Sequence, residues 1–438
     1  MKNCFRIRFI LYLSFLIILP NPSDDVVAQP KGYNYDESKV PDYQLPMLLE
    51  TDTGKRINSP KEWASIRRPQ ILHHLEQEIY GKNEIPLGQF KVQTRLIEFG
   101  NSEFGIRKQY SITFNRRDKE LTLNVLVFLP SKVEKPVPVF LGLNFRGNHT
   151  VSMDKEIILT QEWIRSGNGV KNNRATQEGR GIASSRWDIK QILSSGYGLI
   201  TAYYGEIDPD FDDGFKNGIH NLLNSNRTQK PSSGGSIDAW AWGLSRLVDF
   251  INTEQEFDKN RIIVIGHSRL GKAALWAGAK DQRIALVISN NSGCGGAAIS
   301  RRRFGETVKR INSSFPHWFC ENYKKYNDRE EKCIVDQHSL LSLMAPRPLY
   351  VASASDDLWA DPYGEFLSIK ETIKVYQLYG FNFNQDWNKR RKQLIEPGMS
   401  LTGKIGYHLR EGKHDVTSSD WKKFIQFAEY NLNRSDKN

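Results

Sequence analysis

The chain has 438 residues, of which 39% are hydrophobic and 25% charged. This composition is that of an ordinary globular protein and excludes collagen-like, low-complexity and intrinsically disordered classes. The formal net charge of +11 favours contact with polyanions. Because no nucleic-acid recognition motif accompanies the charge, we expect an acidic polysaccharide as the partner and no nucleic acid. A generally basic, solubilising surface is the alternative explanation.

Residues 1–28 have the features of a signal peptide. Three basic residues precede the apolar stretch 9–19, which is too short to span a bilayer, and small residues at 26–28 precede a cut at Gln29. We therefore expect cleavage there and an exported mature protein, periplasmic or extracellular, without stable membrane insertion. An uncleaved anchor is the alternative.

The mature chain, 29–438, is predicted to form a single decorated domain. A polar lead-in is followed by segments whose apolar residues recur with helix or strand periodicity. We predict helices at 60–80, 236–252, 270–279 and 424–432, and strands at 89–99, 110–114, 121–129, 137–143, 197–204, 261–265, 284–289 and 348–352. The polar, glycine-rich stretch 151–187 is predicted to be an insertion over one face. Alternating strands and helices imply an α/β three-layer sandwich, with a mostly parallel central sheet covered on both faces.

Cysteine usage limits the possible cross-links and metal sites. The mature chain keeps Cys294, Cys320 and Cys333, an odd number that leaves at least one thiol free. Cys320 and Cys333 are close in sequence and could pair in an oxidising compartment. No cysteine or histidine spacing typical of metal sites occurs, so no structural metal is predicted.

The segment 263–272, with the sequence IVIGHSRLGK, predicts a strand followed within three residues by a helix. The tight turn between them raises Ser268 above the sheet edge at a helix N-terminus, where unpaired backbone N–H groups can stabilise an oxyanion. This pattern indicates the nucleophile elbow of an α/β-hydrolase. The usual glycine two residues after the serine is replaced by Leu270, and the glycine follows at Gly271. A structural turn with an N-cap serine is the alternative.

Two downstream segments carry the partners that a serine nucleophile needs. Asp356 and Asp357 follow the strand at 348–352, and His414 precedes the last helix. A serine hydroxyl is a weak nucleophile unless a base takes its proton, and an acid must hold that base in the right tautomer. The order Ser268, Asp357, His414 therefore predicts a catalytic triad. Asp356 competes with Asp357 for the role of the acid.

The chain resembles the bacterial glucuronoyl esterases of carbohydrate esterase family 15. That family carries a Gly-Cys/His-Ser-Arg-x-Gly-Lys elbow with the same displaced glycine, matched here by residues 266–272. The resemblance spans roughly residues 140–415. The other matching segments are AWAWG at 239–243, NSGCGGA at 291–297, FPHWF at 315–319 and WADP at 359–362.

The resemblance implies roles for several residues around the elbow. Arg269 would bind the oxyanion with its side chain and backbone N–H, although a surface ion pair is the alternative for this residue. Lys272 would contact sugar hydroxyls and Trp359 would line the sugar pocket. We expect Glu306 to accept hydrogen bonds from sugar hydroxyls. Three further tryptophans are expected in the core: Trp240, Trp242 and Trp318.

The resemblance also shows two departures from fungal members of the family. Those members carry the triad acid as a glutamate directly before a Ser-Gly-x-Gly-Gly segment, where this chain has Asn291. The acid is therefore expected at Asp357. His267 stands where fungal members have a cysteine, so the disulfide formed by that cysteine is expected to be missing.

The activity implied by the resemblance is hydrolysis of esters that join 4-O-methyl-glucuronic acid on xylan to lignin alcohols. The acyl-enzyme would form on Ser268, no cofactor would be needed, and the partner would be glucuronoxylan or a lignin–carbohydrate ester. We expect a monomer. Two alternatives remain open: an acetyl-xylan or feruloyl esterase on the same fold, and a catalytically silent glycan-binding homologue.

Overall fold

The computed structural model describes residues 29–83, 87–132, 136–223, 230–383 and 396–432, so the predicted signal peptide lies outside the described residues. The chain divides into two compact units, Met1–Gly32 and Tyr33–Asn438. The second unit holds every helix and strand of the described residues. No described helix combines the length and apolar character needed to cross a membrane.

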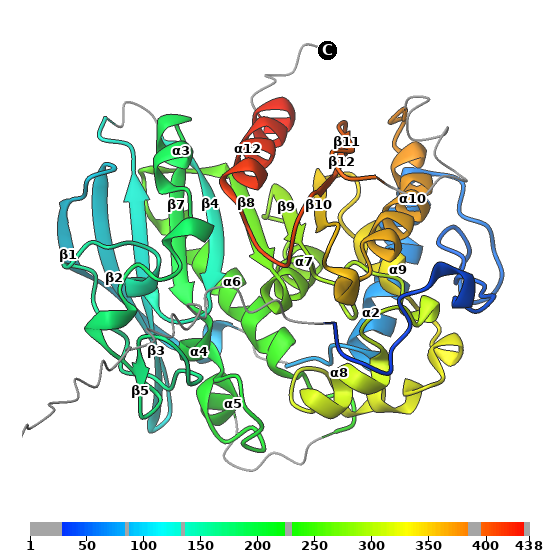
Figure 1. Ribbon diagram of the computed structural model, residues 1–438, viewed down its shortest axis with the longest axis horizontal. Helices are drawn as coiled ribbons and strands as arrows, with labels where there is room; N and C mark the ends of the chain where they lie inside the picture. Colours follow the sequence, from blue (N-terminus) through cyan, green and yellow to red (C-terminus); the bar gives the residue numbers. More distant parts are fainter. Residues whose placement is uncertain (1–28, 84–86, 133–135, 224–229, 384–395, 433–438) are drawn as a thin grey trace, which may run out of the picture. The chain divides into compact units, whose positions relative to one another are not determined.

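A ten-stranded sheet with the order β1-β2-β3-β7-β4-β8-β9-β10-β12-β11 forms the centre of this unit (Figure 1). The run from β7 to β12 is parallel, whereas β1, β2, β3 and β11 pair antiparallel at the two edges. The prediction of an α/β-hydrolase sandwich with a mostly parallel sheet is confirmed. The strands are β1 Lys91–Asn101, β2 Ile106–Arg116, β3 Lys119–Leu129, β4 Val137–Asn144, β7 Gly198–Tyr203, β8 Phe257–His267, β9 Leu286–Asn290, β10 Leu349–Ala354, β11 Ser400–Leu401 and β12 Ile405–Arg410.

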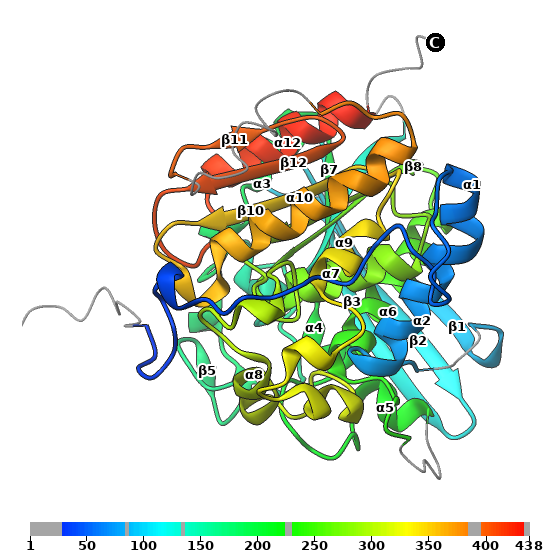
Figure 2. The same ribbon diagram turned by 90° about the vertical axis from the view of Figure 1, so that its right-hand side faces the viewer.

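Helices cover the sheet on both faces (Figure 2). On one face α3 and α12 share a buried cluster with the sheet, and on the other α2, α6, α7, α9 and α10 do so. Strand β8 supplies both clusters because successive side chains point to opposite faces: Ile262 and Val264 to one, Ile263 and Ile265 to the other. The helices are α1 Pro60–Glu62, α2 Arg68–Glu78, α3 Ile189–Ser194, α4 Tyr204–Ile207, α5 Gly218–Leu223, α6 Ser236–Thr253, α7 Arg269–Lys280, α8 Val308–Ser314, α9 Gln337–Ser342, α10 Pro362–Leu378 and α12 Ser418–Leu432.

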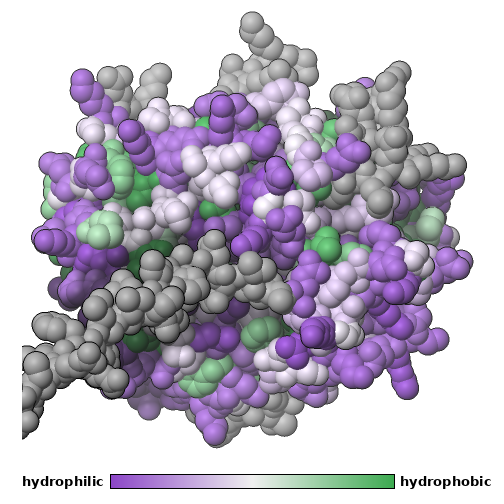
Figure 3. Space-filling view, viewed as in Figure 1, coloured by the Kyte–Doolittle hydropathy of each residue, from purple (hydrophilic) through white to green (hydrophobic). Residues whose placement is uncertain are grey.

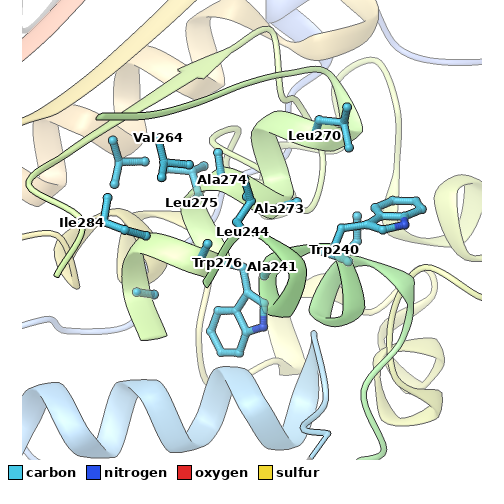
Figure 4. Close-up of a cluster of buried hydrophobic side chains, with 14 of the residues drawn as sticks. Trp240, Ala241, Leu244, Val264, Leu270, Ala273, Ala274, Leu275, Trp276 and Ile284 are labelled. Atoms are coloured by element: carbon cyan, nitrogen blue, oxygen red, sulfur yellow. The ribbon is translucent and has the colours of Figure 1, made fainter. Parts of the chain in front are cut away.

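Small residues bring α7 close to its neighbour α6 and to the sheet (Figure 4). Ala273 and Ala274 of α7 are fully buried in the same cluster as Ala241 of α6 and Val264 of β8. Such residues allow the helix backbones to approach closely. The close packing fixes the position of the α7 N-terminus, which follows Ser268 directly. Trp240 is fully buried in this cluster, which confirms its expected place in the core.

The predicted insertion contains little regular structure. Between β4 and α3 it holds short 3₁₀ turns and a small hairpin of two two-residue strands, β5 Val170–Lys171 and β6 Arg174–Ala175.

The face of the molecule shown in Figure 3 is mainly hydrophilic, with apolar residues scattered over it. Strand β1, at the edge of the sheet, carries four of the exposed large hydrophobic residues: Val92, Leu96, Ile97 and Phe99.

Four features differ from the predictions or settle an open point. Strand β12 and helix α10 were not predicted, and α12 begins at Ser418, six residues before the predicted start. Cys320 and Cys333 do not pair; they and Cys294 are buried free thiols. Burial raises the pKa of each thiol because it penalises the charged form.

Candidate active site

Ser268 lies in a strained turn between β8, which ends at His267, and α7, which begins at Arg269. Its backbone has φ 56° and ψ −129°, a conformation that residues with a side chain rarely adopt. Helix packing on one side and the strand on the other hold it there. The first backbone N–H groups of α7 have no partner within the helix. A negative charge that develops beside Ser268 would therefore meet donors already in place.

Two glycines make the tight turn possible and account for the displaced glycine of the motif. A Cβ on Gly266 would lie 2.0 Å from the carbonyl oxygen of Leu270, and one on Gly271 would lie 3.0 Å from Cβ of Ser292. A glycine is needed at 271 because the loop after β9 passes close to the first turn of α7. Leu270, at the position of the usual glycine, has its side chain buried in the core.

His414 and Asp357 are brought together by the parallel pairing of β10 with β12. Asp357 follows the carboxyl end of β10 and His414 follows the carboxyl end of β12. Because the two strands are parallel, both residues lie at the same end of the strands. His414 Nδ1 is 2.6 Å from Asp357 Oδ2. The carboxylate is buried whereas the imidazole is 41% exposed, which leaves one side of the ring accessible to a bound molecule.

The two alternatives for the acid have different surroundings. Asp356 is exposed, and its carboxylate accepts a hydrogen bond from Ser355 Oγ. Asp357 Oδ2, by contrast, accepts a second hydrogen bond, from Asn291 Nδ2 at 2.8 Å. Asn291 therefore contacts the carboxylate that contacts His414.

Ser268 and His414 are not hydrogen-bonded to each other within the described part of the chain. Such bonds often tighten only when substrate is bound. The segment that contains Ser268 and the segment that contains His414 are linked through His267, whose ring centroid is 4.4 Å from that of His414. Asn290 Nδ2 extends the link by donating both to His267 Nδ1 and to the carbonyl oxygen of Asp415.

Burial, followed by the charge of His414, holds the pKa of His267 well below its ordinary value, so its ring is neutral. Because Nδ1 accepts a hydrogen bond, the ring proton lies on Nε2. The segment that would hold a nucleophile and the segment that would hold its base are thus joined by hydrogen bonds.

Arg269 is held in a cage of aromatic rings and a buried carboxylate. Its Cζ lies 4.9 Å from the ring centroid of Trp318 and 5.7 Å from that of Phe145, within the range of cation–π attraction. Its Nη1 forms an ion pair with the fully buried Asp210. Trp318 is buried as expected of a core residue, but it also contacts a candidate functional residue.

Asp210 is the central residue of this cage and was not found by sequence reasoning. Its carboxylate also accepts hydrogen bonds from Trp318 Nε1, at 2.7 Å, and from Tyr204, and its Oδ1 lies 3.0 Å from His317 Nε2. Burial alone would raise its pKa, but the His317 bond and the charge of Arg269 outweigh burial and hold the pKa well below its usual range. The sequence around it offers only two aspartates, Asp208 and Asp210, on either side of Pro209, and this pattern alone does not indicate a functional residue.

Lys272, Glu306 and Trp359 form a second cluster, in which Lys272 of α7 attracts Glu306 and the backbone of Glu306 is bonded to that of Trp359. Lys272 is buried and donates to the carbonyl oxygen of Ser292. Burial lowers the pKa of Lys272 and raises that of Glu306, and the attraction between the two opposes both shifts. The Glu306 N–H donates to the Trp359 carbonyl oxygen at 3.0 Å, so the two segments lie side by side.

The lead-in segment contributes an aromatic residue that sequence reasoning did not assign to the site. The ring of Tyr33 packs edge-on against Trp359, with centroids 4.9 Å apart. The carbonyl oxygen of the next residue, Asn34, accepts from the Gly305 N–H at 2.8 Å. An aromatic corner, a cation and a carboxylate are a suitable set for binding a polar ring such as a sugar.

Comparisons with known proteins identify relatives over nearly the whole chain. The model of the family described as fungal glucuronyl esterase matches residues 192–380. Carbohydrate esterase MZ0003, from an unknown prokaryotic organism, is 46% identical over 421 residues, which cover 94% of this chain and 95% of the relative.

Two solved structures share both sequence and fold with the chain. One is a promiscuous CE15 esterase from a marine bacterial metagenome: 44% identity, TM-score 0.84, 92% of this chain and 100% of that one covered. The other is a glucuronoyl esterase from Solibacter usitatus: 40% identity, TM-score 0.83, 90% of this chain and 100% of that one covered.

Proposed function

Because the chain belongs to the glucuronoyl esterases of carbohydrate esterase family 15 and is thus a carboxylic ester hydrolase, we propose that it is an exported serine esterase that cleaves esters of 4-O-methyl-glucuronic acid, such as those linking glucuronoxylan to lignin. The observation that carries the proposal is the 2.6 Å contact of His414 with Asp357 at the sheet edge where Ser268 stands in its strained turn.

In the first half of the reaction Ser268 Oγ attacks the ester carbonyl carbon while His414 Nε2 takes its proton. Asp357 holds Nδ1–H and stabilises the imidazolium. When the tetrahedral intermediate collapses, the bond from carbon to the alcohol oxygen breaks and His414 gives its proton to that oxygen. Water then attacks the acyl-enzyme with His414 as base, releasing the uronic acid and Ser268.

The oxyanion of the tetrahedral intermediate is stabilised at the N-terminus of α7. The backbone N–H of Arg269 and the guanidinium on the same residue provide the donors. Asp210 engages Nη1, but the Nε–H of Arg269 is buried and makes no hydrogen bond within the described residues. A donor held rigidly in this way needs no reorganisation as charge develops, and losing one such donor typically reduces kcat by about 10²–10³-fold.

Asp210→Asn is expected to lower kcat/KM on a glucuronate ester by about tenfold to a hundredfold, less than the loss of an oxyanion donor. The reason is that Asp210 acts through Arg269, as a positioning residue. The decisive measurement is a double-mutant cycle. In the Arg269→Ala background the same change should cost no more than about twofold. Equal losses in both backgrounds would show that Asp210 only supports the fold.

Lys272, Glu306 and Trp359 are proposed to bind the sugar ring, with Trp359 against its face and the two charged groups on its hydroxyls. A site that hydrogen-bonds a hydroxyl discriminates strongly against an epimer, because its own buried polar groups are then left unpaired. This arrangement supports a uronic acid as the acyl part and argues against a simple acetyl group.

The expected result is a preference for methyl glucuronate over methyl galacturonate of at least about tenfold in kcat/KM. Glu306→Gln, which keeps the shape and removes the charge, should reduce that preference. Equal efficiency of the wild type on both epimers would refute the proposed sugar site. Acetyl and feruloyl esters measured alongside test the two rival esterase activities.

A further inference from the structure

His414, the proposed base, stands in a surface loop, residues 411–417, between the end of β12 and the start of α12. Glu411, Lys413 and His414 itself are exposed, so packing against the core contributes little to holding this part of the chain. The hydrogen bond from Nδ1 to Asp357 orients the ring but does not place the backbone that carries it. Misplacing a reacting group by about 1 Å can cost about a hundredfold in rate, so the position of this backbone matters for catalysis.

The guanidinium of Arg410, the last residue of β12, donates to three backbone carbonyl oxygens of this loop. Its Nη1 donates to that of Glu411 at 3.1 Å. Its Nη2 donates to those of Lys413 and of Asp415, the latter at 2.9 Å. The Arg410 side chain is only 10% exposed, although the loop that it holds lies at the surface. Because Lys413 and Asp415 are the two neighbours of His414, the arginine fixes the backbone on both sides of the proposed base.

The guanidinium is itself held by Asp420 of α12. The Oδ2 atom of Asp420 accepts from Arg410 Nε at 3.1 Å and from the backbone N–H of Thr417 at 2.7 Å. Thr417 Oγ1 in turn accepts from the backbone N–H of Asp420 at 3.3 Å, which is the reciprocal arrangement of a capping box at the start of a helix. One carboxylate therefore ties Arg410 to the first turn of α12, and the end of the loop is fixed together with its middle.

A buried histidine completes the network behind the loop. His408 Nε2 lies 2.7 Å from Asp420 Oδ1, and its Nδ1 lies 2.9 Å from the hydroxyl of Tyr350. Burial lowers the pKa of His408, so the ring is neutral, with Nε2–H donating to the carboxylate and Nδ1 accepting from the tyrosine. Burial alone would raise the pKa of Asp420, but its hydrogen bond with His408 and the nearby positive charge outweigh burial and lower it. Asp420 is therefore charged at neutral pH, and both of its oxygens have partners.

We propose that Arg410 is a positioning residue of the esterase, which acts through the loop backbone to place His414 for proton transfer, and that Asp420 holds its guanidinium in place for this task. The inference rests on the proposed function, because it takes His414 as the base. The arrangement needs an arginine: a guanidinium carries its donors on three nitrogens in a rigid planar fork, whereas a lysine ammonium is a single point of charge. Only the fork meets a carboxylate and the loop carbonyls at the same time.

The first test is Arg410→Lys, which keeps the charge beside Asp420 and loses the fork. We expect kcat on methyl glucuronate to fall by about tenfold to a hundredfold, as the misplacement of a reacting group does. The dissociation constant for glucuronic acid should stay the same, because the proposed sugar-binding residues lie on other segments. Asp420→Asn should lower kcat in the same direction, and in the Arg410→Lys background it should add little. An unchanged kcat in the Arg410→Lys variant would overturn the proposal.

The chain offers a matched control in Arg347. This arginine also donates to backbone carbonyl oxygens, among them those of Gly278 and Ile284, but it precedes β10 and so lies at the opposite end of the parallel strands from His414. Arg347→Lys should lower the temperature of thermal unfolding and leave kcat unchanged. If both lysine variants lose kcat in proportion to their loss of stability, Arg410 only supports the fold and the proposal is wrong.

A second measurement separates failure of this inference from failure of the proposed function. A fluorophosphonate probe carries no sugar, and its reaction with Ser268 still needs His414 to take the proton. The rate of labelling should fall in the Arg410→Lys variant by about the same factor as kcat and should not change in Arg347→Lys. A wild type that is labelled but hydrolyses no glucuronate ester would refute the proposed function, and the labelling rates would still decide the role of Arg410. Equal labelling rates in the wild type and Arg410→Lys would refute that role, and a wild type that is not labelled would overturn both.

Discussion

Ser268→Ala is expected to reduce hydrolysis of a glucuronate ester to below about 1% of the wild-type rate, because removing a triad member usually costs several orders of magnitude. Alanine fits the strained turn no worse than serine does, since the strain at φ 56° depends on the backbone and Cβ. The fold and the binding of the sugar should therefore persist. The measurement is kcat/KM together with thermal unfolding and the dissociation constant for glucuronic acid.

A chemical label provides an independent reading of the same residue. A fluorophosphonate probe should modify the wild type at the peptide that contains Ser268 and should leave the alanine variant unlabelled. Ser292→Ala serves as a control, since this serine is buried next to the elbow. Turnover above about 1% in a folded Ser268→Ala variant would show that another group is the nucleophile.

Asp357→Asn is expected to lower turnover by orders of magnitude while the protein remains folded. The amide keeps the shape of the side chain but loses the charge that stabilises the His414 cation, and it no longer fixes the ring tautomer. The 2.6 Å contact of Oδ2 with His414 Nδ1 is the physical basis. Asp356→Asn should have much less effect, because that carboxylate is exposed and bonds to Ser355.

The matched set for this prediction is Asp357→Asn, Asp356→Asn and Asn291→Ala, measured on one glucuronate ester after equal thermal stability has been confirmed. Asn291→Ala removes one of the two hydrogen bonds to Asp357 Oδ2 and should cost less than losing the charge. An active Asp357→Asn variant together with an inactive Asp356→Asn variant would exchange the two roles. Full activity of both would place the acid elsewhere.

Sequence reasoning was most successful where local chemistry determines the structure. The change from a β-branched strand at 261–265 to a helix of small residues predicts the elbow at Ser268, and the structure has that turn. The position of Asp357 after β10 and of His414 before α12 also follows from chain order alone. Strand β12 was missed because its sequence, IGYHLR, is short and contains polar residues that the fold buries.

The rest of the site depends on contacts between distant segments. Asp210 and Arg269 are 59 residues apart, and nothing in either neighbourhood indicates that they meet. Tyr33 packs against Trp359 only because the lead-in runs past η10, the short turn Leu358–Ala360. Such pairings arise from tertiary packing, for which a single sequence carries no periodic signal.

The contact between Asn291 and Asp357 has a consequence for how such a triad diverges. Asn291 stands at the end of β9, at the position where, by resemblance, fungal members carry their acid, and its side chain meets the carboxylate that comes from the end of β10. Residues from the ends of two neighbouring strands thus meet at the one carboxylate oxygen that contacts the imidazole. A carboxylate at the end of either strand would therefore lie close to the same base, so this fold offers two positions for the acid of the triad.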